Sequence, residues 1–158
     1  MKTLVLGLGN PLLSDDSVGI RVAEFLRDKI NQGGITVEEA SVGGLNLLDL
    51  LVGFDKAIII DAIQTESGQA GQIYRLNLES FDAIRRSATS HDLSLTNALE
   101  LGNRLRLALP KYLTIFAVEA KEVSFFSEQC SPQVEAAIPA CAKMVMVELL
   151  GDKPLYDL

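Results

Sequence analysis

Residues 1–19 read MKTLVLGLGNPLLSDDSVG, and this stretch decides how the rest of the chain is interpreted. Residues 3–8 are almost entirely apolar and do not alternate, which is typical of a strand covered on both faces. Two glycines and an Asn-Pro pair follow, and this composition predicts a turn. Asp15 and Asp16 come next, where carboxylates suit the positive end of a helix and can cap its free N–H groups. We therefore expect a strand, a turn and a helix that starts near Asp15.

A dinucleotide-binding turn is the first alternative, and the spacing argues against it. That fingerprint requires a third glycine three positions after the second, for close helix packing and phosphate approach. The corresponding position holds Leu12. Two carboxylates at the start of the helix would also repel a pyrophosphate.

The composition of the whole chain sets broad limits. A length of 158 residues predicts a single domain, residues 1–158, that is large enough for a real core. The formal net charge of −7 argues against nucleic-acid and anionic-membrane partners and suits a basic or metal-bearing partner. We expect a cytoplasmic protein without membrane insertion, because no signal peptide and no membrane-length apolar run are apparent. Cys130 and Cys141 fit a reducing compartment better than a disulfide framework.

Strand patterns alternate with helix patterns along the chain. We expect further strands at residues 35–40, 56–60, 72–76 and 113–118, and helices at residues 45–52, from about 95, and from 132. Pro139 should bend or split the last of these helices. The alternation predicts an α/β fold: a three-layer α/β/α sandwich on a mostly parallel twisted sheet, with one antiparallel edge strand.

Three polar groups fall near carboxyl ends of predicted strands, where ligands bind in such sheets. The Asp15-Asp16 pair follows the first strand, Asp61 should terminate the strand at residues 56–60, and His91 lies in a polar loop before a helix. Taken singly, each has a plain alternative: a helix cap, a turn residue and a loop histidine. Together they offer two carboxylates and the chain's only histidine, a set that suits zinc, nickel, iron or manganese.

The opening GLGNPLLSDDSVG resembles the start of the hydrogenase maturation endopeptidases, whose pattern is G-x-G-N-x-L-x-x-D-[DE]-x-x-G. The IIIDA run around Asp61, the TSHDL loop around His91 and the CSP entry to the last helix are also similar to that family. The resemblance implies an endopeptidase that removes the C-terminal extension of a nickel–iron hydrogenase large-subunit precursor after nickel insertion. It maps the family's metal-binding residues onto Asp16, Asp61 and His91. The implied metal is nickel, as held by the precursor, and no organic cofactor is implied.

Two segments depart from the family pattern. The glycine-rich loop after the second strand reads EASVGG at residues 39–44 instead of D-G-G-T-x-G, and Ala120 stands where a proline is common. Both segments could line the cleft, and we expect Asn10, Gly43 and Gly44 to be substrate-binding residues. The chain lacks a nucleophile–histidine–carboxylate set and an H-E-x-x-H motif, so an aspartyl-type or a metal-dependent endopeptidase is expected.

Two other functions share part of this pattern. A nickel-binding chaperone that docks on a hydrogenase precursor without cutting it would carry the same Asp16, Asp61 and His91. The string GLGNP is also similar to the start of bacterial peptidyl-tRNA hydrolases. Those enzymes continue with glycine where Leu12 stands, carry an early histidine and need a basic RNA-binding face, all of which this acidic chain lacks.

Overall fold

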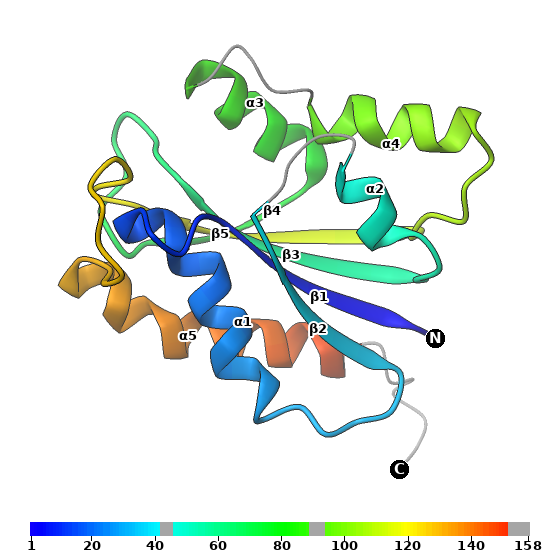
Figure 1. Cartoon of the computed structure of the whole chain (residues 1–158), viewed down its shortest axis with the longest axis horizontal. Helices are drawn as coiled ribbons and strands as arrows, with labels where there is room; N and C mark the ends of the chain where they lie inside the picture. Colours follow the sequence, from blue (N-terminus) through cyan, green and yellow to red (C-terminus); the bar gives the residue numbers. More distant parts are fainter. Residues whose placement is uncertain (42–45, 89–93, 152–158) are drawn as a thin grey trace.

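The computed structural model describes residues 1–41, 46–88 and 94–151, and within them the chain forms a five-stranded sheet in the order β2-β1-β3-β5-β4 (Figure 1). The strands are β1 (Thr3–Leu8), β2 (Ile35–Ala40), β3 (Lys56–Ile63), β4 (Ile73–Leu76) and β5 (Tyr112–Glu119). The β2–β1, β1–β3 and β3–β5 pairs are parallel, and β4 pairs with β5 in the antiparallel sense. The prediction of a mostly parallel sheet with one antiparallel edge strand is therefore confirmed.

Helices cover both faces of the sheet, which confirms the three-layer arrangement. They are α1 (Val18–Arg27), α2 (Asn46–Leu51), α3 (Leu78–Ala88), α4 (Leu95–Arg104) and α5 (Pro132–Leu150), and a short 3₁₀ helix, η1 (Ser14–Ser17), precedes α1. In Figure 1, α1 and α5 lie on one side of the sheet, and α2, α3 and α4 lie on the other. The chain leaves β1 towards one edge of the sheet and returns to place β3 on the opposite side of β1.

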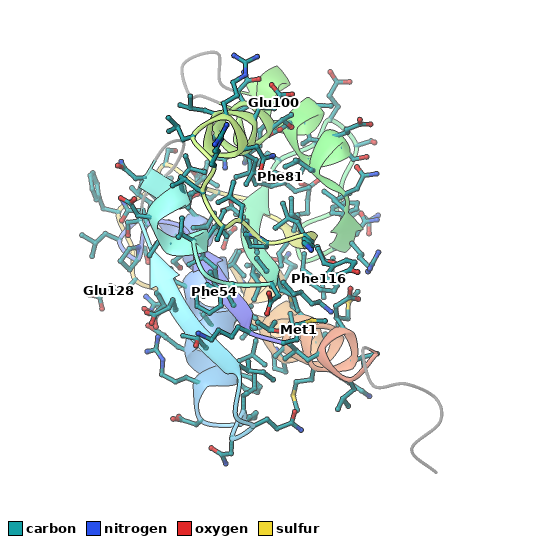
Figure 2. All side chains as sticks on the ribbon, turned by 90° about the vertical axis from the view of Figure 1, so that its right-hand side faces the viewer. Met1, Phe54, Phe81, Glu100, Phe116 and Glu128 are labelled. Atoms are coloured by element: carbon teal, nitrogen blue, oxygen red, sulfur yellow. The ribbon has the colours of Figure 1, made fainter. Side chains whose placement is uncertain are left out.

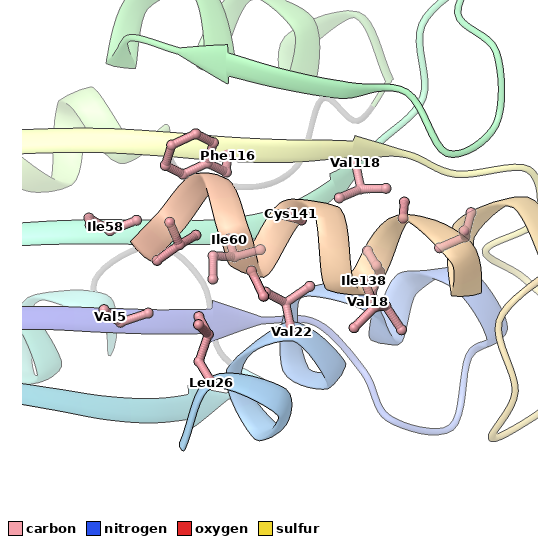
Figure 3. Packing of buried hydrophobic residues seen from close by; sticks show 14 residues of the cluster. Val5, Val18, Val22, Leu26, Ile58, Ile60, Phe116, Val118, Ile138 and Cys141 are labelled. Carbon is pink, nitrogen blue, oxygen red and sulfur yellow. The ribbon is translucent and has the colours of Figure 1, made fainter. Parts of the chain in front are cut away.

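Two apolar layers, one on each face of the sheet, form the core. Figure 3 shows the first, in which Val5, Ile60 and Phe116 of the strands pack against α1 and α5. The second layer contains Phe81 and packs under α2, α3 and α4. Figure 2 shows Phe81 and Phe116 on opposite sides of the sheet. Both faces of β1 and β3 are covered, which explains why their sequences do not alternate.

The structure differs from the sequence-based expectations at three places. The first α-helix begins at Val18, because residues 14–17 form η1 instead of the first turn of α1. The helix α5 continues through Pro139 as one element, so the proline does not split it. The helix α3, with the sequence LESFDAIRRSA, was not predicted from the sequence pattern.

Glycines bring α1 into backbone contact with the sheet. A Cβ atom added at Gly7 of β1 would lie 2.2 Å from the carbonyl oxygen of Gly19. A Cβ atom at Gly19 of α1 would lie 2.3 Å from the carbonyl oxygens of both Leu8 and Ile60. No side chain fits at such distances, so the start of α1 packs directly on the ends of β1 and β3.

None of the helices in the described part of the chain is long and apolar enough to cross a membrane.

We predict that Gly19→Ala destabilises the fold by about 3 kcal/mol, because the added methyl group forces the backbone of α1 away from two carbonyl oxygens. The free energy of unfolding measured in urea tests this. Gly33→Ala is the matched control, since a Cβ atom there meets nothing within 4 Å. An unfolding midpoint for Gly19→Ala equal to that of the control would contradict the close approach.

Candidate functional site

An open cleft of about 140 Å³ lies at the carboxyl-end side of the sheet, where the loops after β1 and β3 diverge. This is the place where open α/β sheets bind ligands. It combines acidic, basic and apolar side chains from η1, the end of β3, α3 and the loop after β5. The residues that line it are Asp16, Ala62, Ile63, Gln64, Ile84, Arg85 and Val123.

Asp16 reaches the cleft from η1, and glycine at position 9 makes this possible. Gly9 has a φ angle of +146°, and a Cβ atom there would lie 2.0 Å from the carbonyl oxygen of Asp16. The Asp16 side chain is half-buried, and its Oδ2 accepts a hydrogen bond from the backbone N–H of Asn10 at 3.1 Å. Burial raises the pKa of Asp16, while the Asn10 N–H and the charge of Arg85 act in the opposite direction. The side chain does not cap α1.

Asp61 lies within β3 and not at its end, which corrects the sequence-based expectation. The strand continues to Ile63 because its parallel pairing with β5 extends to Glu119. Only 5% of Asp61 is exposed. Its Oδ1 accepts a hydrogen bond from the N–H of Ala62 at 2.8 Å, and its Oδ2 accepts one from Arg85 at 3.2 Å.

The pKa of Asp61 is raised to about 7, and burial is the largest cause. Arg85 and the N–H of Ala62 lower the pKa, whereas the negative charge of Asp16 raises it. Asp16 is therefore close enough for its charge to act on the carboxyl group of Asp61. A pair of like charges in a partly buried cleft favours the arrival of a cation.

Arg85 is a site residue that the sequence analysis missed. It lies on α3, its guanidinium carbon is 5.4 Å from the ring centre of Phe81, and it forms the ion pair with Asp61. The side chain is 43% exposed and lines the cleft beside Asp16. A signal existed: Arg85 follows Phe81 by four residues, so both lie on one face of a helix.

Of the other predicted site residues, the structure describes only Asn10. Asn10 is in place, and its Oδ1 accepts a hydrogen bond from the N–H of Leu12 at 2.9 Å, so its side chain shapes the loop before Asp16. His91, Gly43 and Gly44 lie outside the described residues. Within residues 1–41, 46–88 and 94–151, no three His, Cys, Asp or Glu side chains are grouped to hold a metal ion. The two carboxylates are thus the part of the predicted set that the structure brings together.

The helices on either side of residues 89–93 are joined to each other. Asp82 of α3 is 2% exposed and accepts hydrogen bonds from the backbone N–H groups of Leu95, at 3.2 Å, and Thr96, at 2.9 Å. The side chain of Ser94 caps the same helix end by accepting from the N–H of Asn97 at 3.1 Å. The start of α4 is therefore held against α3 by a buried carboxylate.

Asp15 has a structural task that its sequence neighbour Asp16 does not share. Its side chain is fully buried and accepts hydrogen bonds from the N–H groups of Lys121 (2.9 Å), Glu122 (3.0 Å) and Ser131 (2.6 Å), and from the Ser131 hydroxyl (2.9 Å). We call residues 120–131, between β5 and α5, the 120–131 loop. Asp15 ties this loop to η1. Ser131 occupies the N-cap position of α5, but its side chain does not cap the helix, because its hydroxyl donates to Asp15.

Comparison with known proteins assigns this arrangement to one family. Residues 20–148 match the family model described as hydrogenase maturation protease. The chain is 30% identical, over 94% of its length and 91% of the relative, to the hydrogenase 2 maturation protease of Escherichia coli. Its fold is similar to that of the hydrogenase maturating endopeptidase HybD from E. coli (TM-score 0.79, 29% identity, 96% and 93% of the two chains covered). It is also similar to a hydrogenase 2 maturation peptidase from a Thaumarchaeota archaeon (TM-score 0.65, 25% identity, 97% and 100% covered).

The raised pKa of Asp61 predicts how stability depends on pH in metal-free buffer. Between pH 4 and pH 7 the folded protein keeps the Asp61 proton and the unfolded chain, with its ordinary pKa of 3.8, does not, so stability falls as the pH rises. Asp61→Asn removes this dependence. We expect the wild-type protein to lose up to about 4 kcal/mol relative to the variant between pH 4 and pH 8.

Urea unfolding of both proteins at several pH values measures this difference. Glu148→Gln is the control of opposite sign, because Arg75 lowers the pKa of Glu148 and that contribution to stability is lost on acidification instead. Parallel pH profiles for the wild-type and Asp61→Asn proteins would show that Asp61 titrates normally.

Proposed function

Because the chain belongs to the hydrogenase maturation protease family, we propose that it removes the C-terminal extension of a nickel–iron hydrogenase large-subunit precursor once nickel has been inserted. The observation that carries the proposal is that Asp16 lines the cleft while the buried Asp61 feels its charge and forms an ion pair with Arg85, which also lines the cleft. In the proposed complex, the nickel held by the precursor enters this cleft and is recognised by Asp16, Asp61 and His91.

The electrostatics of the cleft support recognition of a cation. Burial raises the pKa values of both Asp16 and Asp61, so the ionised pair is unfavourable without a nearby positive charge. Arg85 supplies that charge at 3.2 Å from Asp61. A nickel ion would compete with the guanidinium for the same carboxylate, and carboxylate with imidazole is a donor set that nickel accepts.

Recognition of the metal would also place the bond to be cut. A precursor fixed at its nickel has its tail held beside the cleft, and such positioning lowers the barrier of the chemical step. Two peptidase chemistries fit these residues. The metal can polarise the scissile carbonyl, or a carboxylate of the site can accept a proton from the attacking water.

A mass-spectrometric processing assay tests the proposal. The purified protein is mixed with nickel-loaded and with nickel-free large-subunit precursor from the same source. Loss of a C-terminal peptide from the nickel-loaded form alone is the expected result. Binding without loss of mass would replace the protease with a non-cutting chaperone, and removal of the tail from both forms would contradict the role of nickel.

Asp16→Asn and His91→Ala should each slow the processing of nickel-loaded precursor by about 100-fold, because each removes one proposed contact to the metal. The fold should be retained, since Asp16 lies at the rim of the cleft and makes no packing contact in either core layer. Thermal unfolding checks this. Asp49→Asn, which changes an exposed carboxylate on α2, is the matched control and should process at the wild-type rate. Wild-type processing by a folded His91→Ala protein would remove His91 from the site.

A further inference from the structure

Three residues with exposed apolar side chains lie on two neighbouring segments beside the cleft and have no role in the site described above. Leu12 is 53% exposed, Phe125 is 68% exposed and Phe126 is 85% exposed. Two consecutive phenylalanines in water are unfavourable for a protein that acts alone, and aromatic side chains are frequent at the energetic centres of protein interfaces. We call these three residues the apolar rim.

Backbone hydrogen bonds hold the apolar rim together as one unit. The N–H of Ser127 donates to the carbonyl of Leu12 at 2.9 Å, and the N–H of Ser14 donates to the carbonyl of Ser127 at 2.9 Å. The hydroxyl of Ser14 donates to the carbonyl of Phe125 at 2.7 Å. The phenylalanines are thus presented by a loop that is already ordered, and a preformed surface loses less entropy when a partner binds.

The apolar rim is continuous with the cleft. Val123 lines the cleft with Asp16, and Phe125 follows it by two residues in the 120–131 loop. On the other side, the N–H of Asp16 donates to the carbonyl of Leu13, the neighbour of Leu12, at 3.0 Å. Figure 1 shows the 120–131 loop and the start of α1 at the same end of the sheet. A protein that reaches the two carboxylates would therefore also cover the apolar rim.

The size of the apolar rim selects the partner. A stable interface buries about 800 Å² on each partner, whereas large aromatic side chains bury about 150–250 Å² each. The three side chains of the apolar rim therefore bury less area than a stable interface needs. In a dimer of this chain the contact would consist of two apolar rims alone, and its area would remain too small. A partner that also carries a metal ion for Asp16 and Asp61 adds a second, adjacent contact. We infer that the apolar rim docks an apolar patch on the folded body of the hydrogenase precursor, next to its metal; this inference rests on the proposed function.

Steady-state processing of nickel-loaded precursor by the Phe125→Ser/Phe126→Ser double variant tests the inference. We expect the KM for the precursor to rise about tenfold, kcat to stay unchanged and the same tail to be removed, because docking is weakened and the cleft is intact. Tyr112→Ser is the matched control. Tyr112 is an aromatic residue of 60% exposure at the opposite end of β5, and its KM should equal that of the wild type.

The outcomes distinguish a failure of the docking role from a failure of the proposed function. A wild-type KM in the double variant, with normal processing by the wild type, would overturn the docking role and leave the proposed function standing. A fall in kcat without a change in KM would also overturn docking, since it indicates damage to the cleft. If the wild type neither processes nor binds the precursor, the proposed function and the docking role are overturned together.

A second measurement covers the case in which the double variant does not fold. A photoreactive phenylalanine analogue at position 126 keeps the aromatic ring and, on illumination, should crosslink to the nickel-loaded precursor. The same analogue at position 112 should not crosslink to it. Crosslinks at position 126 only between two copies of this chain would show that the apolar rim is a self-association surface and would overturn the inference.

Discussion

The buried carboxylate of Asp15 joins the loop after β1 to the 120–131 loop, and the geometry of the cleft depends on this contact. Its four hydrogen bonds compensate for the burial of a charged group that would otherwise be strongly unfavourable. Successive residues of a 3₁₀ helix point in directions about 120° apart. With Asp15 directed into the protein, its neighbour Asp16 is left to face the cleft. Two identical residue types at adjacent positions therefore have separate tasks, one in holding the structure and one in the site.

Close backbone packing at glycines also fixes the position of Asp16. Gly7 and Gly19 allow α1 to lie against the backbone of β1 and β3, and Gly9 allows the loop to pass directly over the carbonyl of Asp16. Asp61 belongs to β3, which is paired on both sides within the sheet. The two carboxylates are thus carried by the most constrained part of the fold, which suits a site that must present its ligands in a fixed geometry.

The sequence predicted the parts of this structure that depend on local pattern. The apolar runs predicted β1, β3 and β5, and the rule for carboxyl ends of parallel strands predicted that Asp16 and Asp61 lie near each other. It did not separate Asp15 from Asp16, because the hydrogen-bond donors for Asp15 come from residues more than one hundred positions away. It placed Asp61 one residue after a strand, because the continuation of β3 depends on pairing with β5. Arg85 was missed because α3 was not predicted and because its contact with Asp61 joins residues 24 positions apart in the sequence.

The long reach of Asp15 also bears on the order in which the protein can acquire its site during synthesis. The strand β1, Asp15 and Asp16 leave the ribosome early. The hydrogen-bond partners of Asp15 belong to the loop that precedes the last helix, 106 to 116 residues later. Contacts between such distant segments form late, because long stretches of chain must be ordered first. The nascent chain therefore carries Asp16 for most of its synthesis without the loop that completes the cleft. The cleft can be completed only after the 120–131 loop has been synthesised and has reached η1.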